Sequence, residues 1–549
     1  MSCDEVKEYA LLFYVKNNIE KPDNVFKERS LCVAADFSID EKKYLFEQTR
    51  LLKEAWHKGD EETLNRCRIN DMDFGVYEVF LEDSTRTRES FRNAAEFHGV
   101  KLSMFNSDSS SFNKRESYLD GFMTLVGYSN HIFIVRSRLE GVCRWLQLKG
   151  EKFAERNNLG YKPVFVNAGD GKHEHPTQEL LDEFTLIEDN HWRTDSLHIA
   201  LVGDLFHGRT VHSKADGLKI FDNVKVDLVA PPELAMPKQY IDKMKENGFQ
   251  LRVFHSLEEY LSQPDIASRF YFTRPQLERM GERILKRQDE LREKITFRED
   301  FIHKLPDQEN TFFYHPLPRH KEHPTIPTIL DDLPLNHWEN QSINGMFVRI
   351  VLLSAIAGKI GADFSGETVV GKDYPDDFIR EVSPDTSKPK TLKEGINPLA
   401  NGVVIDRFCR GESKENIWDY LFKTIKIMGF NRYKGSIGVG ESKKDPGVYK
   451  GLIFLPKIKE LSSSDIRRLA ALTAGCTVNI VKDNKVAKKL RLTSPPRIYK
   501  IKGTGCTNKD CISHYSHWEH VPPEFIRRGD GTLECYYCGS PHRFKDIWK

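Results

Sequence analysis

Short apolar segments alternate with amphipathic ones between about residues 76 and 364. The apolar segments have the length of buried strands, and the intervening segments repeat apolar residues about every 3.6 positions, as helices that cover a sheet do. This alternation predicts parallel β-sheets covered by helices, arranged as two successive α/β domains. The predicted strands are residues 76–81, 131–136, 163–169, 197–204, 225–232, 269–274 and 311–318.

The pattern changes after residue 364. Residues 365–395 are rich in Pro, Asp, Ser and Lys, which predicts a linker. Beyond the linker, short apolar strands (GVVIDRF, GSIGVG, KGLIFLP, CTVNIVK) and two amphipathic helices predict a smaller α+β domain. The predicted division of the chain is 1–29 as an N-terminal extension, 30–178 and 179–364 as the α/β domains, 365–395 as the linker, 396–497 as the α+β domain, and 498–549 as a small β domain.

Composition and charge narrow the class of protein. The 549 residues are 39% hydrophobic and 30% charged, with a formal net charge of +1. A chain of this length predicts several domains, and its charge balance gives no reason to expect nucleic acid or an anionic membrane as a partner. Neither a membrane-spanning apolar run nor a signal peptide is recognisable. We therefore expect a soluble, cytoplasmic protein.

The stretch FLEDSTRTR places three hydroxyls and two guanidinium groups between a predicted strand and a predicted helix. Ser84, Thr85, Arg86 and Thr87 would lie at the helix N-terminus, where free N–H groups and the helix dipole favour an anion. The set of donors suits a tetrahedral phosphate. The alternative is an ordinary helix cap followed by a solvated basic turn.

Other polar residues also follow predicted strands. In GDGKHEHPTQ, His175 and Gln178 lie at a strand-to-helix corner, where a histidine can donate to a carbonyl oxygen that gains negative charge. In HPLPR, the two prolines remove N–H donors and leave the carbonyls of Pro316 and Leu317 free to accept hydrogen bonds. A lone histidine is more often structural, so these motifs acquire weight from their common position.

Arginines recur at the same kind of position. Arg86, Arg136, Arg209 and Arg274, the last followed by Gln276, all stand at or near predicted strand ends. In parallel α/β sheets, ligands bind beyond the carboxyl ends of the strands. Each arginine alone could be a surface charge, but four at four strand ends favour a site for an anionic ligand.

Four cysteines near the C-terminus have metal-ligand spacing. Cys506 and Cys511 form one close pair, and Cys535 and Cys538 form a second pair after 23 residues. Two such pairs can complete a tetrahedral thiolate site with no position left for water. The spacing therefore predicts a structural Zn²⁺ site.

Taken in order, STRTR, GDG…HPTQ, GDLxxGRTVHS, FTRxQxER and HPLPR resemble the aspartate carbamoyltransferase catalytic chain over residues 30–364. GVVIDR, CTVNIV, CxxxxCISH and CxxC resemble the regulatory chain of the same family over residues 396–548. The resemblance implies a fusion of the two chains. It also implies that the α/β domains bind carbamoyl phosphate and aspartate, in that order, and that the α+β domain is of the nucleotide-binding type.

The resemblance implies transfer of the carbamoyl group of carbamoyl phosphate to L-aspartate, in pyrimidine synthesis. It gives catalytic roles to Arg86, Thr87, Arg136 and His175. Carbamoyl phosphate would be bound by these residues together with Ser84, Thr85, Gln178, Pro316 and Leu317. Aspartate would be bound by Arg209, Arg274 and Gln276. Leu317-Pro318 would be a candidate cis peptide bond.

Further implications concern partners. Ser110 and Lys114 match residues that the family supplies from a neighbouring subunit, which implies a homo-oligomer built on a catalytic trimer. Asp406, Lys450 and Lys489 match nucleotide-contacting positions, so CTP and ATP are candidate effectors.

Several positions depart from the family pattern. Arg115 and Phe206 stand where relatives commonly have glycine and lysine, and Arg407 stands where a histidine is common. The hairpin-like GSIGVGESKKDPGVYKG also differs, and it lacks the spacing of a phosphate-binding P-loop. A catalytically impaired scaffold that binds carbamoyl phosphate or a nucleotide is therefore the alternative. The complete set of reactive groups favours the enzyme.

Overall fold

The computed structural model describes residues 24–105, 117–276, 286–369, 377–383, 399–442, 445–473, 475–499, 501, 503–529, 531–544 and 546–547. These residues form two compact units. One contains the described residues up to Arg138 and those from Leu146 to Val369, and the other contains Leu139–Trp145 with the described residues beyond Val369. No helix in the described ranges is long and apolar enough to cross a membrane.

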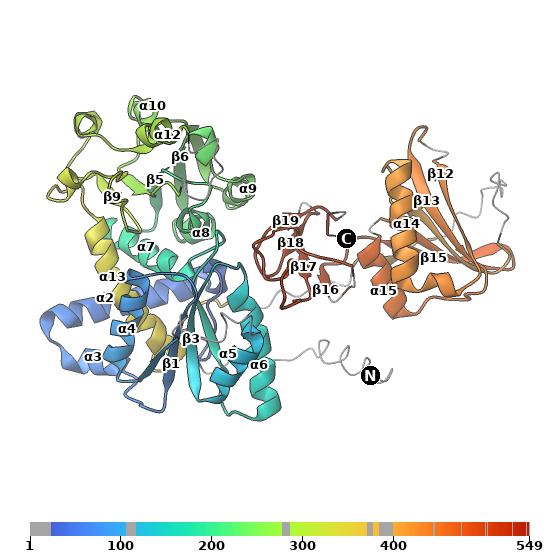
Figure 1. Cartoon of the computed structure of the whole chain (residues 1–549), viewed down its shortest axis with the longest axis horizontal. Coiled ribbons are helices and arrows are strands. Elements are labelled where there is room, and N and C mark those ends of the chain that lie inside the picture. Colours follow the sequence, from blue (N-terminus) through green and yellow to red (C-terminus); the bar gives the residue numbers. More distant parts are fainter. Residues whose placement is uncertain are drawn as a thin grey trace. The chain divides into compact units, whose positions relative to one another are not determined.

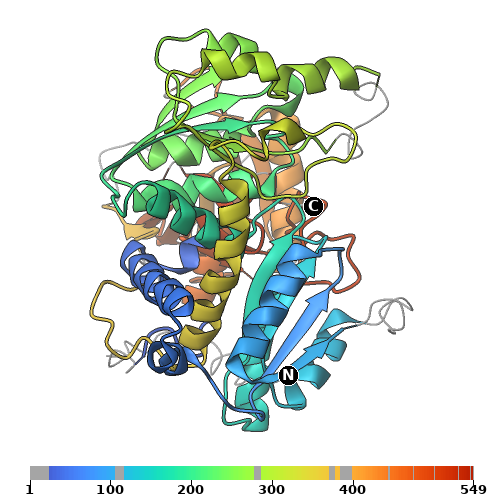
Figure 2. The same cartoon turned by 90° about the vertical axis from the view of Figure 1, so that its left-hand side faces the viewer.

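Two parallel sheets organise the first unit, which confirms the predicted fold class (Figures 1 and 2). The first sheet has the order β2-β1-β3-β4 and the second has the order β7-β6-β5-β8-β9. The strands are β1 (Gly75–Phe80), β2 (Lys101–Met104), β3 (Asn130–Ser137), β4 (Val164–Asp170), β5 (Ser196–Val202), β6 (Asn223–Val229), β7 (Gln250–Phe254), β8 (Arg269–Phe272) and β9 (Phe312–Tyr314).

Helices cover both sheets. Those around the first sheet are α2 (Ile39–Lys58), α3 (Glu61–Cys67), α4 (Arg86–His98), α5 (Tyr118–Gly127), α6 (Val142–Asn157) and α7 (Pro176–Asp189). Those around the second are α8 (Arg209–Gly217), α9 (Lys238–Glu246), α10 (Leu257–Leu261) and α12 (Gln288–Ile295). The long helix α13 (Trp338–Ile356) contacts α2, α4 and α7 as well as β9 (Figure 1). One hydrophobic core therefore runs through both sheets and holds them together.

Strands β2 and β7 are absent from the sequence prediction. Both lie at the edge of their sheets, and most of their side chains are partly or fully exposed. An edge strand buries fewer side chains than a central strand, so KLSM and QLRVF lack the apolar run by which the central strands are recognised.

An antiparallel sheet with the order β10-β15-β14-β11-β13-β12 forms the larger part of the second unit. Its strands are β10 (Ile379–Glu381), β11 (Gly402–Phe408), β12 (Ser436–Glu441), β13 (Tyr449–Leu455), β14 (Thr477–Lys482) and β15 (Lys485–Leu492), and its helices are α14 (Lys414–Met428) and α15 (Ser463–Leu472). The pairing of β12 with β13 confirms the predicted hairpin. Strand β10 lies within the segment expected to be a linker, because Phe378 beside it is buried in this core.

The remainder of the second unit is a small antiparallel sheet with the order β16-β17-β18-β19. Its strands are β16 (Arg497–Tyr499), β17 (Glu524–Arg527), β18 (Leu533–Cys535) and β19 (Pro541–His542). These strands are two to four residues long, so the sheet itself can bury few apolar side chains. A domain of this kind usually needs a metal or disulfides for stability.

Candidate active site and metal centre

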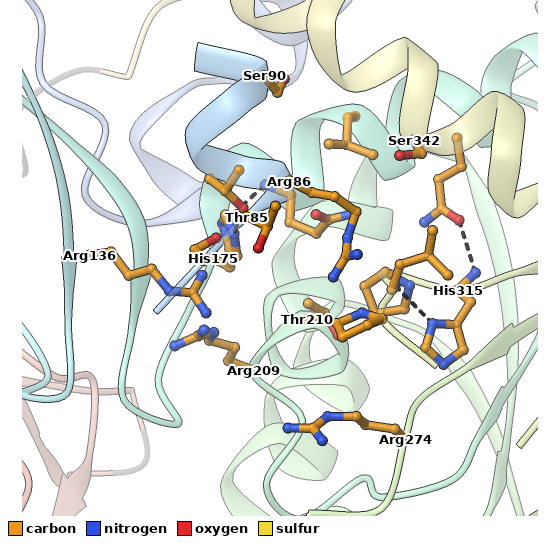
Figure 3. Close-up of a pocket in the computed structure, with 18 of the residues that line it drawn as sticks. Thr85, Arg86, Ser90, Arg136, His175, Arg209, Thr210, Arg274, His315 and Ser342 are labelled. Carbon is orange, nitrogen blue, oxygen red and sulfur yellow. Dashed lines mark hydrogen bonds between the residues drawn. The ribbon is translucent and has the colours of Figure 1, made fainter. Parts of the chain in front are cut away.

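A cavity of about 680 Å³ opens in the first unit, at the carboxyl end of β3, beside α13, and among the segments that follow β1, β4, β5, β8 and β9 (Figure 3). All the substrate-binding residues predicted within the described ranges line it: Ser84, Thr85, Arg86, Thr87, Arg136, His175, Gln178, Arg209, Arg274, Gln276, Pro316 and Leu317. Ser110, Lys114 and Arg115 lie outside the described residues. The topology therefore brings together residues that are far apart in the chain.

The start of α4 forms one end of the cavity. Thr85 is the N-cap of this helix, and its side chain makes no capping hydrogen bond. Arg86 is exposed, whereas Thr87 is 7% exposed. The first N–H groups of α4, the hydroxyls and the Arg86 guanidinium together provide donors for an anion, and the helix dipole favours negative charge there.

His175 is held as a neutral hydrogen-bond donor. It is the N-cap of α7, directly before Pro176, and its Nδ1 atom accepts the backbone N–H of Gln178 at 3.3 Å. The ring proton therefore lies on Nε2, which is 3.4 Å from the Thr87 hydroxyl. Burial, followed by the charges of Arg209 and Arg136, holds the pKa of His175 well below its usual value of 6.5. A neutral imidazole at this position can donate through Nε2 to a substrate oxygen.

Glu82 lies between two of the site arginines. Its Oε2 atom accepts a hydrogen bond from Arg209 Nη1 at 3.2 Å and lies 3.6 Å from Arg136 Nε. Arg136 also donates to the Ala168 carbonyl at 3.1 Å, and Arg209 donates to the Gly171 carbonyl at 3.2 Å. The carboxylate thus fixes the positions of two guanidinium groups. Sequence reasoning missed this role of Glu82, although its position at a strand end within FLEDSTRTR was an available signal.

The absence of a side chain at Gly169 allows Arg136 and Arg209 to approach the backbone closely. Its φ of 112° is unfavourable for any residue with a side chain. A Cβ atom at this position would lie 2.9 Å from Arg209 Cζ and 3.2 Å from Arg136 Nη1. The glycine near the end of β4 is therefore required both by the backbone conformation and by the close approach of the guanidinium groups.

A buried carboxylate also supports the other end of the cavity. Asp204, which is fully buried after β5, accepts the backbone N–H of Gln276 at 2.9 Å and that of His207 at 2.9 Å. The Gln276 side chain donates to the His207 carbonyl at 3.2 Å. Asp204 therefore connects the Arg274 loop to the Arg209 loop, a role that sequence reasoning missed. Phe206 is 43% exposed, and its ring packs edge-on against His207.

The HPLPR loop is held by His315. Its Nδ1 atom accepts the Leu317 N–H at 2.8 Å, and its own backbone N–H donates to Gln341 Oε1, from α13, at 2.9 Å. The Leu317-Pro318 bond is cis, as expected, and Leu317 has a φ of 52°. Burial lowers the pKa of His315 to about 3, so the ring remains neutral and keeps its acceptor. These contacts orient the carbonyls of the loop.

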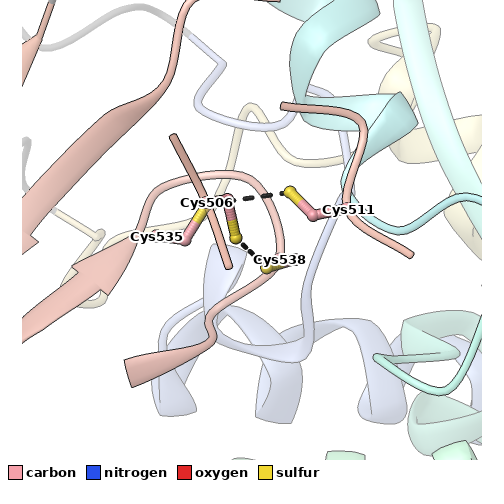
Figure 4. A group of neighbouring side chains, drawn as sticks. All are labelled: Cys506, Cys511, Cys535 and Cys538. Carbon is pink, nitrogen blue, oxygen red and sulfur yellow. Dashed lines mark hydrogen bonds between the residues drawn. The ribbon is translucent and has the colours of Figure 1, made fainter. Parts of the chain in front are cut away.

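The four predicted metal ligands form one buried cluster in the second unit (Figure 4). The sulfur atoms lie within 4.8 Å of one another, with 3.7 Å between Cys506 and Cys538 and 3.8 Å between Cys511 and Cys535. Zinc–sulfur bonds of about 2.3 Å in a tetrahedron require sulfur–sulfur distances of about 3.8 Å. The donors therefore fit a closed, structural Zn²⁺ site.

Residues Leu139–Trp145 contact the polypeptide around this cluster within the same unit. Glu140 accepts a hydrogen bond from the Asn508 side chain at 2.6 Å, and its N–H donates to the Asp510 carbonyl at 2.8 Å. The Asn508 amide also lies 3.6 Å from Cys538 Sγ. The metal centre and the segment around Glu140 therefore support each other.

The candidate nucleotide residues lie on three strands of the larger sheet of the second unit. Asp406 on β11 pairs with Lys450 on β13, with 2.7 Å between Oδ1 and Nζ. Lys489 on β15 is directly opposite Asn479 on β14, which is itself opposite Val404 on β11. Because side chains alternate along a strand, these residues share one face of the sheet. Asn479 is a polar neighbour that sequence reasoning missed.

Comparison with known proteins gives four successive family matches. They are "Aspartate/ornithine carbamoyltransferase, carbamoyl-P binding domain" over residues 29–188 and "Asp/Orn binding domain" over 195–356. "Aspartate carbamoyltransferase regulatory chain, allosteric domain" matches residues 394–493, and the "metal binding domain" of that chain matches 496–548.

Two curated proteins are similar over nearly the whole chain. Protein PyrBI of Treponema denticola is 58% identical, covering 96% of this chain and 99% of that protein. Protein PyrBI of Thermotoga maritima is 48% identical, covering 95% and 99%. A solved structure of aspartate transcarbamoylase from Trypanosoma cruzi, in complex with carbamoyl aspartate and phosphate, is 27% identical. It covers 62% of this chain and 99% of its own, with a TM-score of 0.51.

Proposed function

Since the chain belongs to the aspartate carbamoyltransferase family, as a catalytic chain fused to a regulatory chain, we propose that the cavity of about 680 Å³ is its active site. The enzyme transfers the carbamoyl group of carbamoyl phosphate to L-aspartate, which yields N-carbamoyl-L-aspartate and phosphate for pyrimidine synthesis. The convergence of four arginines from separate strand ends on this cavity carries the assignment (Figure 3).

Carbamoyl phosphate binds at the start of α4. Ser84, Thr85 and Arg86 hold its phosphate, and the charge of Arg86 stabilises the phosphate as it leaves. The carbamoyl oxygen accepts hydrogen bonds from Thr87, Arg136 and His175, which is neutral and protonated on Nε2. Negative charge develops on this oxygen when the amine attacks, so these donors favour the tetrahedral transition state over the bound substrate.

Aspartate binds at the other end of the cavity. Arg209, Arg274 and Gln276 hold its two carboxylates, a dianion that suits guanidinium groups. The carbonyls of Pro316 and Leu317 accept hydrogen bonds from the amine of aspartate and from the carbamoyl NH₂ group. The reaction needs no covalent enzyme intermediate, so the contribution of the protein is orientation and charge stabilisation.

Partners complete the proposal. Ser110 and Lys114 of a neighbouring subunit contribute to each site, which makes a trimer the smallest active assembly. CTP and ATP bind the sheet face that carries Asp406, Lys450 and Lys489; the acidic residue suits a base or ribose, and the lysines suit phosphates.

The test is the initial rate of carbamoyl-aspartate formation by the purified full chain, with L-aspartate or L-ornithine as acceptor, with and without CTP. We expect carbamoyl transfer to L-aspartate and none to L-ornithine. Arg86→Ala should lower kcat by a factor on the order of 1,000, because it removes a charge that stabilises the transition state. Arg92→Ala, an exposed arginine on the same helix, is the matched control. Equal rates for both variants, or transfer to ornithine, would overturn the proposal.

A further inference from the structure

Three buried charged residues that have no assigned role in the reaction lie behind the cavity. Lys214, on α8, is fully buried. Its Nζ atom lies 2.9 Å from Asp182 Oδ2 and 3.0 Å from Glu179 Oε2, both on α7. The same nitrogen lies 4.0 Å from the centre of the Tyr271 ring, on β8. These contacts therefore join the elements that carry His175, Arg209 and Arg274.

Asp182 also accepts hydrogen bonds from two glutamines. Its Oδ1 atom lies 2.9 Å from Gln178 Nε2 and 2.6 Å from Gln341 Nε2. Asp182 is 2% exposed, so these partners and Lys214 replace water around the carboxylate. An ionised carboxylate accepts hydrogen bonds and donates none, so each glutamine must present its NH₂ group to Asp182.

This requirement determines where each amide oxygen points. With its NH₂ group on Asp182, Gln341 presents Oε1 to the backbone N–H of His315 at 2.9 Å, which orients the HPLPR loop. Gln178 lines the cavity, and with its NH₂ group on Asp182 its Oε1 atom is the one left for a ligand. If the proposed function holds, the ligand there carries an NH₂ group, the carbamoyl amide, which needs an acceptor rather than a donor.

We propose that Asp182 is a positioning residue that fixes the amide orientation of Gln178 and Gln341, and that Lys214 holds Asp182 in place. A buried charge without a partner is costly, which explains why a lysine is buried opposite this carboxylate. An asparagine in place of the aspartate could donate as well as accept. The amide of Gln178 could then turn over and direct its NH₂ group at the carbamoyl NH₂ group.

The next residue of the same helix provides a matched control. Glu183 is as deeply buried as Asp182, and its carboxylate pairs with Lys42 of α2 at 2.8 Å. Glu183 does not line the cavity. Glu183→Gln therefore removes an equally buried carboxylate from α7 without releasing either glutamine.

The experiment compares steady-state kinetics of the full chain in four variants. Asp182→Asn should lower kcat/KM for carbamoyl phosphate by about 10- to 100-fold, mainly through KM, because a mispaired donor replaces an acceptor. Glu183→Gln should remain within about twofold of the parent chain. Gln178→Glu should also be impaired, because two carboxylates then face each other.

The combination of Asp182→Asn with Gln178→Glu decides the question. The introduced asparagine can donate to the introduced carboxylate, whose second oxygen is an acceptor whichever way it turns, and the net charge of the parent chain is restored. Because Gln178 and Gln341 both donate to Asp182 Oδ1, this variant restores the contact at position 178 but not the one with Gln341. We expect this double variant to regain at least about tenfold over Gln178→Glu alone, because an asparagine that donates to Glu at position 178 replaces the repulsion between two facing carboxylates. This comparison also holds if Asp182→Asn alone fails to fold.

Two outcomes would overturn the inference: a double variant no better than Gln178→Glu, or equal losses in Asp182→Asn and Glu183→Gln. An inactive parent chain would instead count against the proposed function, so the two failures can be distinguished.

Discussion

Glu78 provides a test of how far burial alone controls a charge in this fold. It lies within β1, is 1% exposed, and neither of its carboxyl oxygens accepts a hydrogen bond within the described part of the chain. Burial raises the pKa of Glu78 from 4.5 to about 7, although the charges of Arg88 and Arg92 on α4 act in the opposite direction. The folded chain is therefore most stable when the Glu78 carboxyl is protonated.

The sign and size of the effect follow from proton linkage. The folded chain binds the Glu78 proton more tightly than the unfolded chain, so the stability associated with protonation is fully present below pH 4.5. It is lost as the pH rises through about 7. The difference between these two pKa values corresponds to about 3 kcal/mol at pH 8.5, and to about 1 kcal/mol at pH 5.

Glu78→Gln should therefore stabilise the first unit by about 3 kcal/mol at pH 8.5 and by only about 1 kcal/mol at pH 5. The measurement is urea unfolding at both pH values, followed by the fluorescence of tryptophans in that unit. The control is Glu62→Gln on α3, where the carboxylate is exposed and its removal should change stability little at either pH. A gain that is equal at both pH values, or a loss at pH 8.5, would refute the reasoning.

Four further outcomes are expected. Gly169→Ala should lower kcat/KM by at least about tenfold, because its Cβ atom displaces Arg209; an unchanged rate would refute the close approach. Glu82→Gln should raise the KM for aspartate by about tenfold, because Arg209 loses its anchor, and steady-state kinetics would measure this. Cys538→Ser, or chelation, should release zinc and lower the melting temperature of the second unit; unchanged melting after verified zinc loss would contradict a structural metal. Burial lowers the pKa of His98 from 6.5 to about 4, so the folded chain favours the neutral imidazole. The stability that this provides is present above pH 6.5 and is lost as the pH falls through 4. Between pH 7 and pH 4, the free energy of unfolding should therefore fall by about 3 kcal/mol less in His98→Gln than in the parent chain, as unfolding at the two pH values would measure.

Much of this protein is determined locally in its sequence. The apolar segments of the central strands, such as β1 and β3, are recognisable because most of their side chains are buried on both faces and polar site residues stand at or just beyond their carboxyl ends. The cysteine spacing likewise indicates a closed metal site, because ligands on two short turns need no distant partner. Residues such as Arg86, His175 and Arg209 are therefore recognisable as candidate site residues from local sequence alone.

Only the tertiary structure reveals interactions between residues far apart in the chain. Glu82 meets Arg209 across 127 positions, and Gln341 meets Asp182 across 159, so no local pattern identifies the partners of these carboxylates. The edge strands β2 and β7, and β10 within the expected linker, likewise depend on pairing with a neighbour rather than on their own apolar content. Sequence determines which groups are available, whereas folding decides which buried charges face one another and so which atoms donate and accept.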